Sequence, residues 1–509
     1  MSKLVLAGVF LVFVLAFFLR VMFLPKNSLT FGYDQARDAI VAQQIIKGDI
    51  KIQGPPASTQ GLYHGVFYYY VLAPAYLLGK GSPIAAAYWI AFLNASVVFV
   101  VFYLTYLLTR KNIFTSILAS LLFAISFEAT QYATWLSNPT IAILTVPLLY
   151  LGLWGWIREG KKWGPLLTGI GLGLSIQSEI FLAYHIVPIA IWLFVSRKNI
   201  TKKQVLTFLM FLGIALSTMI VSEFKFGFRG LEGIKSLAVS AEVSLAYAKS
   251  IGDYLTLYLN QTGRIFAFNS YPGNIGYGGA FVFVLAVVSL LQLKKSKENI
   301  SPEAFLAVWL FSHLTVVTVG GTSTPFLMVG IGPAVSMLIA LYVTRLWKNY
   351  KFIAAALIVI LIYGNMSMIL RENKSGSTLF SIQKDMLLSK ELSAVDYTYE
   401  KASGKPFSTN SLTSPLWINL VWTYLYKWYG QPKYGYVPSW HGKDQIGLID
   451  SLGQTRDDTK TYFLIIEPLA GIPPRYLDET VGEEDTKSRL LEDKAFGEIR
   501  VQYREKLVK

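Results

Sequence analysis

The chain lacks cysteine and is poor in charge. None of its 509 residues is a cysteine, which excludes disulfides, thiolate catalysis and cysteine-ligated metals. Charged residues make up 15% of the chain and hydrophobic residues 53%, whereas soluble domains carry about 25% charged residues. No GxxxxGK[ST] motif occurs, which argues against ATP-driven transport. A chain with this composition is expected to lie mostly in lipid.

Long apolar runs predict about eleven transmembrane helices, because crossing the hydrocarbon core takes about 20 apolar residues. The first run follows Met-Ser-Lys directly and is too long for a signal peptide, so we predict an uncleaved first span. The predicted spans are residues 4–24, 84–109, 113–127, 139–157, 165–180, 182–196, 205–222, 279–293, 303–320, 325–346 and 352–370.

Basic residues collect in every second connection between these runs. By the positive-inside rule these connections face the cytoplasm, and so does the N-terminus. The net charge of +15 is then explained by topology and anionic lipid, not by nucleic acid. The clusters begin at Lys3, Arg110, Arg158, Arg197, Lys294 and Arg345.

The outer connections follow from this topology. Residues 66–79 are apolar and tyrosine-rich but too short to span, so we predict an interfacial helix within an outer loop covering 25–83. A second outer loop runs from Glu128 to Asn138, and a long one covers about 223–278. The fold class is therefore mainly α, with a transmembrane domain over 1–370 and a small outer α/β domain over 371–509.

The first outer loop holds the sharpest group of polar residues, from Asp34 and Gln35 to Arg37 and Asp38. On a helix Asp34 lies one turn from Arg37 and Asp38. Two carboxylates and a guanidinium would then share a face, where a carboxylate can act as general base and the arginine can hold a phosphate. Ordinary charge pairing at a solvated helix start is the alternative.

Other polar residues are placed near the same outer surface. Tyr63 and His64 precede the interfacial stretch, and His64 could bind a phosphate or simply have a polar partner at the interface. Glu128, at the outer end of the third span, could face Asp34 or be a helix-end carboxylate in water. Glu179 and His185 lie near the outer ends of the fifth and sixth spans, where ionisable groups are candidates for substrate binding.

Two further assignments are open at this stage. Asp34, Asp38 and Glu128 could hold a divalent cation through oxygen, although no metal-ligand spacing establishes one. Arg20, near the outer end of the first span, is expected to snorkel to the interface or to meet a lipid phosphate.

This pattern resembles the polytopic GT-C glycosyltransferases, of the family 39 and 83 type that includes protein O-mannosyltransferases and aminoarabinose transferases. An acidic motif with a following arginine, Asp34-Gln35-Ala36-Arg37, comes directly after the first span. A tyrosine-rich stretch from Gly61 to Pro74 follows, then an outer carboxylate, Glu128, and a soluble C-terminal domain. The tail segment 408–422 is weakly similar to the outer domain of such bacterial enzymes.

The resemblance implies a sugar donor on a polyprenyl phosphate, an inverting reaction on the outer face of the plasma membrane, Asp34 as general base and Arg37 at the donor phosphate. The acceptor could be a glycan, a lipid or a protein. Gln35 stands where many relatives have glutamate, and Tyr63-His64-Gly65 where many have Lys-Pro-Pro, so the sugar and acceptor stay open.

Two rival functions remain. A lipid-linked saccharide transporter, or flippase, would use the same groups to bind its substrate without catalysing a reaction. A non-catalytic scaffold would neither bind a substrate nor catalyse a reaction. A transporter is expected to place polar residues in the middle of many spans, whereas this chain places them at the bases of outer loops, which favours the enzyme.

Overall fold

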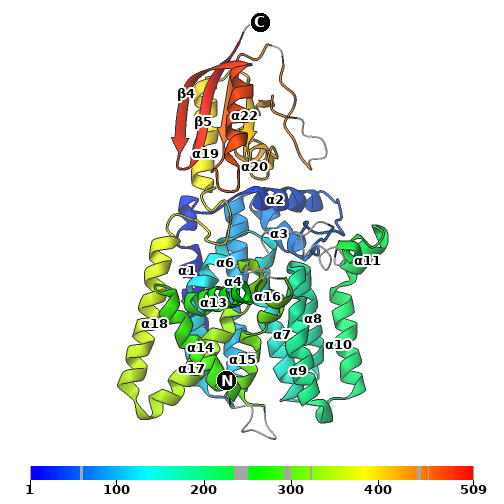
Figure 1. Cartoon of the computed structure of the whole chain (residues 1–509), viewed down its shortest axis with the longest axis vertical. Coiled ribbons are helices and arrows are strands. Elements are labelled where there is room, and N and C mark those ends of the chain that lie inside the picture. The colour runs from blue at the N-terminus through cyan, green and yellow to red at the C-terminus, as the bar shows by residue number, and fades with distance from the viewer. Residues whose placement is uncertain are drawn as a thin grey trace.

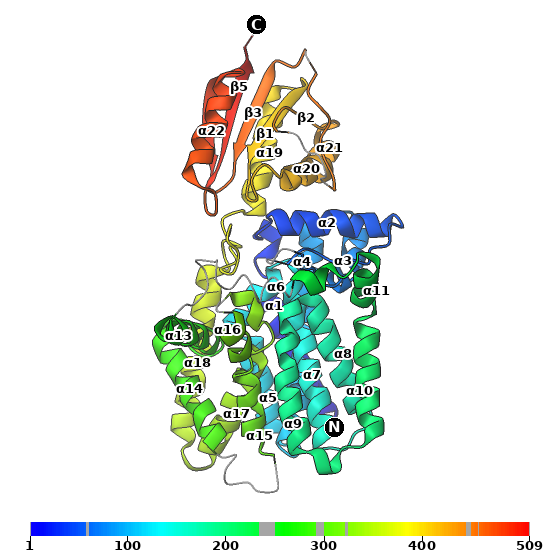
Figure 2. The same ribbon diagram turned by 45° about the vertical axis from the view of Figure 1, so that its right-hand side comes forward.

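A computed structural model describes residues 2–57, 61–233, 250–291, 300–320, 324–443, 449–456 and 458–507. It has a tall helical body with a small sheet domain at one end, and the N-terminus lies at the opposite end of the body (Figures 1 and 2). The predicted basic cluster at Lys294 to Lys297 lies outside the described residues.

The helical body contains seventeen α-helices among the described residues. They are α1 Lys3–Val21, α2 Tyr33–Ile46, α3 Phe67–Leu78, α4 Pro83–Leu108, α5 Ile113–Ala124, α6 Phe127–Thr134, α7 Ala142–Ile157, α8 Trp163–Ser178, α9 Ile186–Val195, α10 Lys202–Ala215, α11 Ser217–Lys225, α13 Ile251–Phe268, α14 Ile275–Leu291, α15 Pro302–Leu310, α16 Leu314–Gly320, α17 Gly332–Asn349 and α18 Lys351–Glu372. Short 3-10 helices are η1 Leu24–Lys26, η2 Asn138–Ile141, η3 Ile180–His185, η4 Arg197–Asn199 and η6 Pro325–Met328.

Each predicted span coincides with one of these helices or with two consecutive ones. Among the described residues, four helices are long and apolar enough to cross a membrane, and six if each of two bent pairs counts as one span. The bend of 57° between α10 and α11 divides the run 205–222 that we predicted as a single span, and the bend of 53° between α5 and α6 lies at the end of the predicted span 113–127. The chain is a multi-pass membrane protein, and the number of eleven spans stays a prediction.

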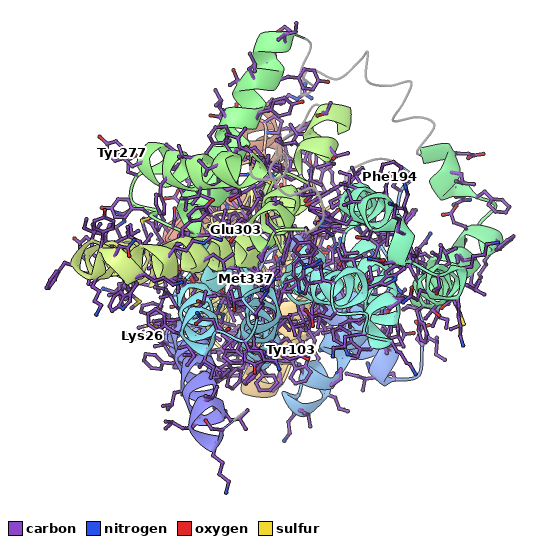
Figure 3. The ribbon with its side chains drawn as sticks, turned by 90° about the horizontal axis from the view of Figure 1, so that it is seen from below. Lys26, Tyr103, Phe194, Tyr277, Glu303 and Met337 are labelled. Carbon is purple, nitrogen blue, oxygen red and sulfur yellow. The ribbon has the colours of Figure 1, made fainter. Side chains whose placement is uncertain are left out.

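The exposed surface of the helical body is unusually apolar. Phe10, Phe194, Tyr277 and Phe352 are more than half exposed, and soluble monomers rarely expose contiguous apolar patches of large area. Seen from below, Tyr277 lies at the periphery of the bundle and Met337 in its middle (Figure 3). These side chains are suited to contact with lipid.

Arg20 does not snorkel. Its side chain is 3% exposed and donates to the Asn94 side chain at 2.6 Å and to the carbonyl of Ala124 at 2.9 Å. It therefore joins α1 to α4 and α5 inside the bundle. A buried guanidinium with several hydrogen-bond acceptors replaces the interfacial contact that we expected.

Two predicted outer loops contain helices. Loop two holds α6, whose first turn is capped by Ser126 accepting from the backbone N–H of Ala129 at 3.1 Å. The predicted loop 223–278 contains α13, which lies across the direction of the long bundle helices (Figure 2). Capping residues and apolar periodicity made these segments helical although neither is a continuous apolar run.

The tail folds into a five-stranded sheet with the strand order β2-β1-β3-β5-β4. Strands β1 Phe407–Leu412, β2 Ser439–Trp440 and β3 Thr461–Ile466 are parallel, and β4 Ser488–Phe496 and β5 Ile499–Lys506 are antiparallel. Helices α19 Leu388–Ala402 and α20 Leu420–Leu425 pack on one face and α22 Pro474–Asp485 on the other, while the π-helical turn η7 Tyr426–Gly430 and α21 Gln431–Tyr434 follow α20. This matches the predicted α/β content, while the domain boundary at residue 370 stays a prediction.

The sheet domain is joined by backbone hydrogen bonds to the loop that we predicted as the first outer one. The N–H of Phe31 donates to the carbonyl of Met386 and the N–H of Leu388 to that of Leu29, both at 2.9 Å. The hydroxyl of Thr30 donates to the carbonyl of Gly376 at 3.0 Å. The segment just before α2 is thereby fixed by residues from the far end of the chain.

Candidate active site

The acidic motif lies at the start of α2, a helix that runs across the top of the bundle beneath the sheet domain (Figure 2). Gln35 caps this helix, because its side-chain oxygen accepts from the N–H of Gly32 at 2.9 Å. Gln35 is thus occupied in holding the helix start, although it also lines the cavity described below.

Arg37 joins the two carboxylates of the motif. Its Nη1 donates to Asp34 Oδ1 at 2.7 Å, and its Nε donates to Asp38 Oδ1 at 2.8 Å. Asp38 is fully buried, and its Oδ2 has no hydrogen-bond partner among the described residues. Burial raises the pKa of Asp38 to about 7, against the charge of Arg37. The Asp34 side chain is 53% exposed, so of these two carboxylates only Asp34 is accessible.

His64 lies near the same place and belongs to the segment of the first loop that precedes α3. Its Nδ1 accepts from the N–H of Ile180 at 3.2 Å, which leaves the ring proton on Nε2. Burial and the charge of Arg37 lower the pKa of His64 to about 3. The 3.7 Å separation between His64 Nδ1 and Glu179 Oε1 therefore joins a neutral imidazole to a carboxyl group and is not an ion pair.

These residues line a cavity of about 390 Å³ between the helical body and the sheet domain. Its wall combines the polar groups of α2 and loop one with four aromatic side chains and with residues of the tail. The lining residues are Gly32, Tyr33, Asp34, Gln35, Arg37, Pro56, Ala57, His64, Trp135, Ser137, Asn138, Pro139, Glu179, Phe326, Phe380, Ser381, Ile382, Gln383, Ser414 and Pro415. Asp34, Gln35, Arg37, His64 and Glu179 thus come together as sequence reasoning placed them.

The remaining predicted residues lie elsewhere. Tyr63 lines a second, mostly apolar cavity of about 200 Å³, which shares His64 with the first. Asp38 lies behind Arg37 and is absent from the cavity lining. His185 is buried among aromatic side chains, and its Nδ1 is 3.0 Å from the Tyr150 hydroxyl. The other ring nitrogen, Nε2, has no hydrogen-bond partner among the described residues.

Glu128 does not face Asp34. It is buried at the start of α6, where its Oε2 accepts from the Asn269 side chain at 2.6 Å, and it does not line the cavity. Arg37 lies between Asp34 and Asp38 and contacts both. In the described part of the chain, no group of three or more His, Asp or Glu residues is placed to hold a metal ion.

Sequence reasoning missed the contribution of the tail to the cavity. Ser381, Gln383, Ser414 and Pro415 reach the cavity because the sheet domain rests on α2. No local motif marks these residues, since their position depends on pairing between segments more than 300 residues apart. Asn138, at the end of the predicted second outer loop, also lines the cavity, and it donates to the carbonyl of Ser178 at 2.5 Å.

Comparison with known proteins identifies the fold. No protein-family model matches the chain, and no curated protein matches it. The fold is that of the polytopic GT-C glycosyltransferases, as the resemblance in the first loop implied.

Among the similar solved structures is ArnT from Cupriavidus metallidurans, an aminoarabinose transferase, bound to undecaprenyl phosphate. It matches with a TM-score of 0.60 at 10% identity over 99% of this chain and 98% of that one. The same protein in the apo state gives a TM-score of 0.58 at 11% identity over 98% and 97% of the two chains. The arabinofuranosyltransferase AftD from Mycobacteria matches at a TM-score of 0.50 and 11% identity, over 100% of this chain and 40% of that one.

Proposed function

We propose that this protein is a glycosyltransferase that moves a sugar from a polyprenyl-phosphate donor to a hydroxyl or amine of an acceptor, with inversion, at the outer face of the membrane. The observation that carries the proposal is the half-exposed carboxylate of Asp34 in a cavity between the membrane body and the sheet domain. The fold shared with ArnT, whose structure holds undecaprenyl phosphate, supports this class of donor.

The reaction follows from the positions of three groups. Asp34 holds Arg37 through Oδ1, which leaves Oδ2 free to accept the proton of the acceptor. The acceptor oxygen or nitrogen then bonds to the anomeric carbon as the bond from that carbon to the phosphate oxygen breaks. The bond electrons and negative charge leave with the polyprenyl phosphate, and stabilising that charge is the main electrostatic task of the site.

Arg37 and His64 are the donors available for this task. Arg37 supplies the positive charge nearest to Asp34, and the neutral imidazole of His64 supplies an N–H at Nε2. The two side chains line one cavity. Four aromatic residues of the wall, Tyr33, Trp135, Phe326 and Phe380, provide apolar faces of the kind that sugar rings stack on.

Substitution of Asp34 by asparagine tests the proposal. Asparagine keeps the shape but accepts no proton, so transfer from polyprenyl-phosphate sugars should fall by about 10²- to 10⁴-fold. The assay uses the purified full-length protein in lipid, a panel of such donors, and mass spectrometry of the acceptor products. Binding of undecaprenyl phosphate, measured separately, should survive in this variant.

Asp49→Asn is the matched control, because Asp49 belongs to the same outer loop and is exposed beside Lys51 but does not line the cavity. It should transfer as the unmodified protein does. Full transfer by Asp34→Asn would exclude the proposed base. Movement of the donor across the membrane without any transfer product would favour a transporter.

A further inference from the structure

A second group of buried polar residues lies in the sheet domain, at the carboxyl ends of β1 and β3. Ser411 of β1 is paired in register with Ile465 of β3, so Ser411, Ile465 and Glu467 point to the same face of the sheet. That face is the one covered by α19 and α20, since Phe407, Phe463 and Ile465 pack with both helices.

The chain connections bring two helix starts to this edge. Helix α19 ends at Ala402, five residues before β1 begins, so its first turn with Glu391 lies beside the end of β1. Helix α20 follows β1 after a short loop, so Asn419 lies at the same edge. Trp422, one turn further along α20, donates from its ring N–H to Glu467 Oε1 at 3.2 Å.

This cluster has a marked excess of polar atoms without partners. Both carboxylate oxygens of Glu391, both side-chain atoms of Asn419, and the hydroxyls of Ser411 and Thr423 have no hydrogen-bond partner among the described residues. All four residues are at most 1% exposed. Burying a polar group without a partner is unfavourable, and more so for a charged group, so several such groups in one place call for an explanation.

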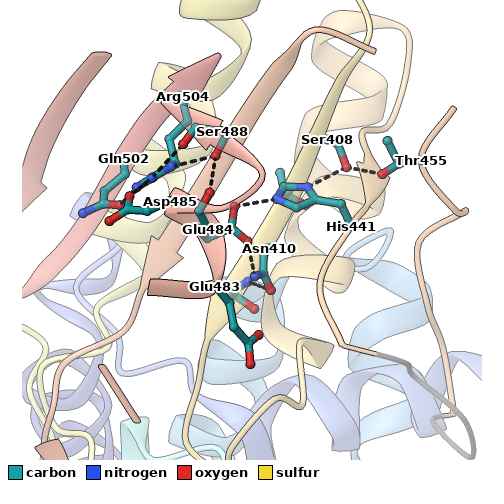
Figure 4. A network of polar contacts seen from close by, with 12 residues as sticks. Ser408, Asn410, His441, Thr455, Glu483, Glu484, Asp485, Ser488, Gln502 and Arg504 are labelled. Atoms are coloured by element: carbon teal, nitrogen blue, oxygen red, sulfur yellow. Dashed lines mark hydrogen bonds and ion pairs between the residues drawn. The ribbon is translucent and has the colours of Figure 1, made fainter. Parts of the chain in front are cut away.

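Another buried network of the same domain shows the contrast (Figure 4). There Glu484 accepts from Asn410 at 2.6 Å and is joined to His441 at 3.2 Å, and His441 is joined to Ser408 at 2.8 Å. Each of these side chains has a partner, which is what a purely structural network requires. The cluster around Glu391 differs because six of its buried side-chain atoms have no hydrogen-bond partner among the described residues.

The chemistry of these unpartnered atoms indicates which kind of ligand the cluster would bind. The two carboxylates repel each other, and the charge of Glu467 adds to burial in raising the pKa of Glu391. No Lys or Arg of the described residues pairs with either carboxylate. The remaining acceptors are amide and hydroxyl oxygens, and Ca²⁺ takes about six to eight such oxygen ligands, whereas Zn²⁺ prefers nitrogen and sulfur.

We propose that Glu391, Glu467, Ser411, Asn419 and Thr423 form a binding site for one calcium ion in the sheet domain. The two carboxylates balance its charge, and the oxygens of the three neutral side chains complete the shell. This inference is independent of the transfer reaction, because it concerns a different cluster and a different ligand.

The position of this site couples it to the cavity. Glu467 Oε2 accepts from the N–H of Ser414 at 2.9 Å, and Ser414 with Pro415 forms part of the cavity wall. Glu391 lies one turn beyond Leu388, which pairs with Leu29 of the first loop. A bound calcium ion therefore fixes the part of the sheet domain that closes the candidate active site.

The test measures calcium binding to the full-length protein after chelator treatment. Isothermal titration with Ca²⁺, Mg²⁺ and Zn²⁺ separately should give one site that prefers Ca²⁺, and calcium should raise the midpoint of thermal unfolding. Glu391→Gln should weaken calcium binding by about tenfold or more, because one of two carboxylate ligands loses its charge. Glu484→Gln, the matched change of a buried carboxylate in the paired network, should keep the calcium-dependent shift.

Asn419→Asp gives a second variant with opposite outcomes. With a calcium site, the added carboxylate tightens binding and raises the calcium-dependent shift. Without one, a third buried carboxylate destabilises the domain at every calcium concentration, and this result overturns the proposal. An unchanged shift in Glu391→Gln overturns it as well, since calcium would then bind elsewhere.

Discussion

Replacing Arg37 by methionine should separate the structural role of the ion triad from its role in transfer. In the triad one guanidinium lies between two carboxylates, at 2.7 Å from an oxygen of Asp34 and 2.7 Å from an oxygen of Asp38. Methionine keeps much of the side-chain length and removes the charge. Asp38, which is fully buried, then loses its positive partner, while Asp34 remains in contact with solvent.

The expected loss in the free energy of unfolding follows from this difference in burial between Asp34 and Asp38. Removing one partner of a buried ion pair costs about 3 to 5 kcal/mol, whereas a half-exposed pair contributes about 0 to 1 kcal/mol. The Asp38 contact should therefore dominate, and Arg37→Met should lose about 3 to 5 kcal/mol. The double variant Arg37→Met/Asp38→Asn also lacks the buried negative charge, so most of this loss of stability should be recovered. Its transfer activity should stay low, because Arg37 no longer holds Asp34.

The assay is thermal or denaturant unfolding of the two variants in the same detergent, together with transfer from a polyprenyl-phosphate sugar. Equal instability of the single and double variants would refute the reasoning, since the cost would not then come from the unpaired charge on Asp38. Full transfer by the double variant would show that Arg37 positions nothing needed for the reaction. Asp38→Asn alone serves as the control for the amide itself.

Two further predictions concern loop one. Because the pKa of His64 is lowered to about 3, the pH profile of transfer between pH 5 and 8 should have the same shape in His64→Gln as in the unmodified protein, and a changed shape would show that the imidazole titrates there. Gly54→Ala should cost about 1 to 3 kcal/mol, because the added Cβ would lie 2.1 Å from the backbone oxygen of Gly65. Gly213→Ala, where nothing lies within 4 Å, should be neutral or slightly stabilising in the same unfolding assay, and an equal loss in both variants would contradict the steric argument.

The helices of the membrane body could be predicted from the sequence because lipid imposes a simple rule. An apolar run must satisfy its own backbone hydrogen bonds, so it becomes a helix whatever its neighbours are. The runs that become α1, α4, α7 and α18 obey this rule. Helices α6 and α13 do not follow this rule, since caps and an amphipathic pattern, not apolar length, specify them.

The candidate site was predictable where it is local and not where it depends on tertiary contact. Spacing along one helix places Asp34, Arg37 and Asp38 together, and the structure has this arrangement. Glu128 follows the third span, but the bend between α5 and α6 turns it toward Asn269. Ser414 and Pro415 carry no signal at all, because the pairing of the tail with loop one decides their position.

The pairing of Thr30 with the tail also sets an order of assembly. Its hydroxyl bonds to Gly376, which is made 346 residues later. At a synthesis rate of about 5 to 20 residues per second, roughly 20 to 70 s pass between these two events. The helix that carries Asp34 is thus synthesised early, whereas its contacts with the tail form late. A chain whose synthesis stops before the tail contains most of its membrane helices but has no complete cavity.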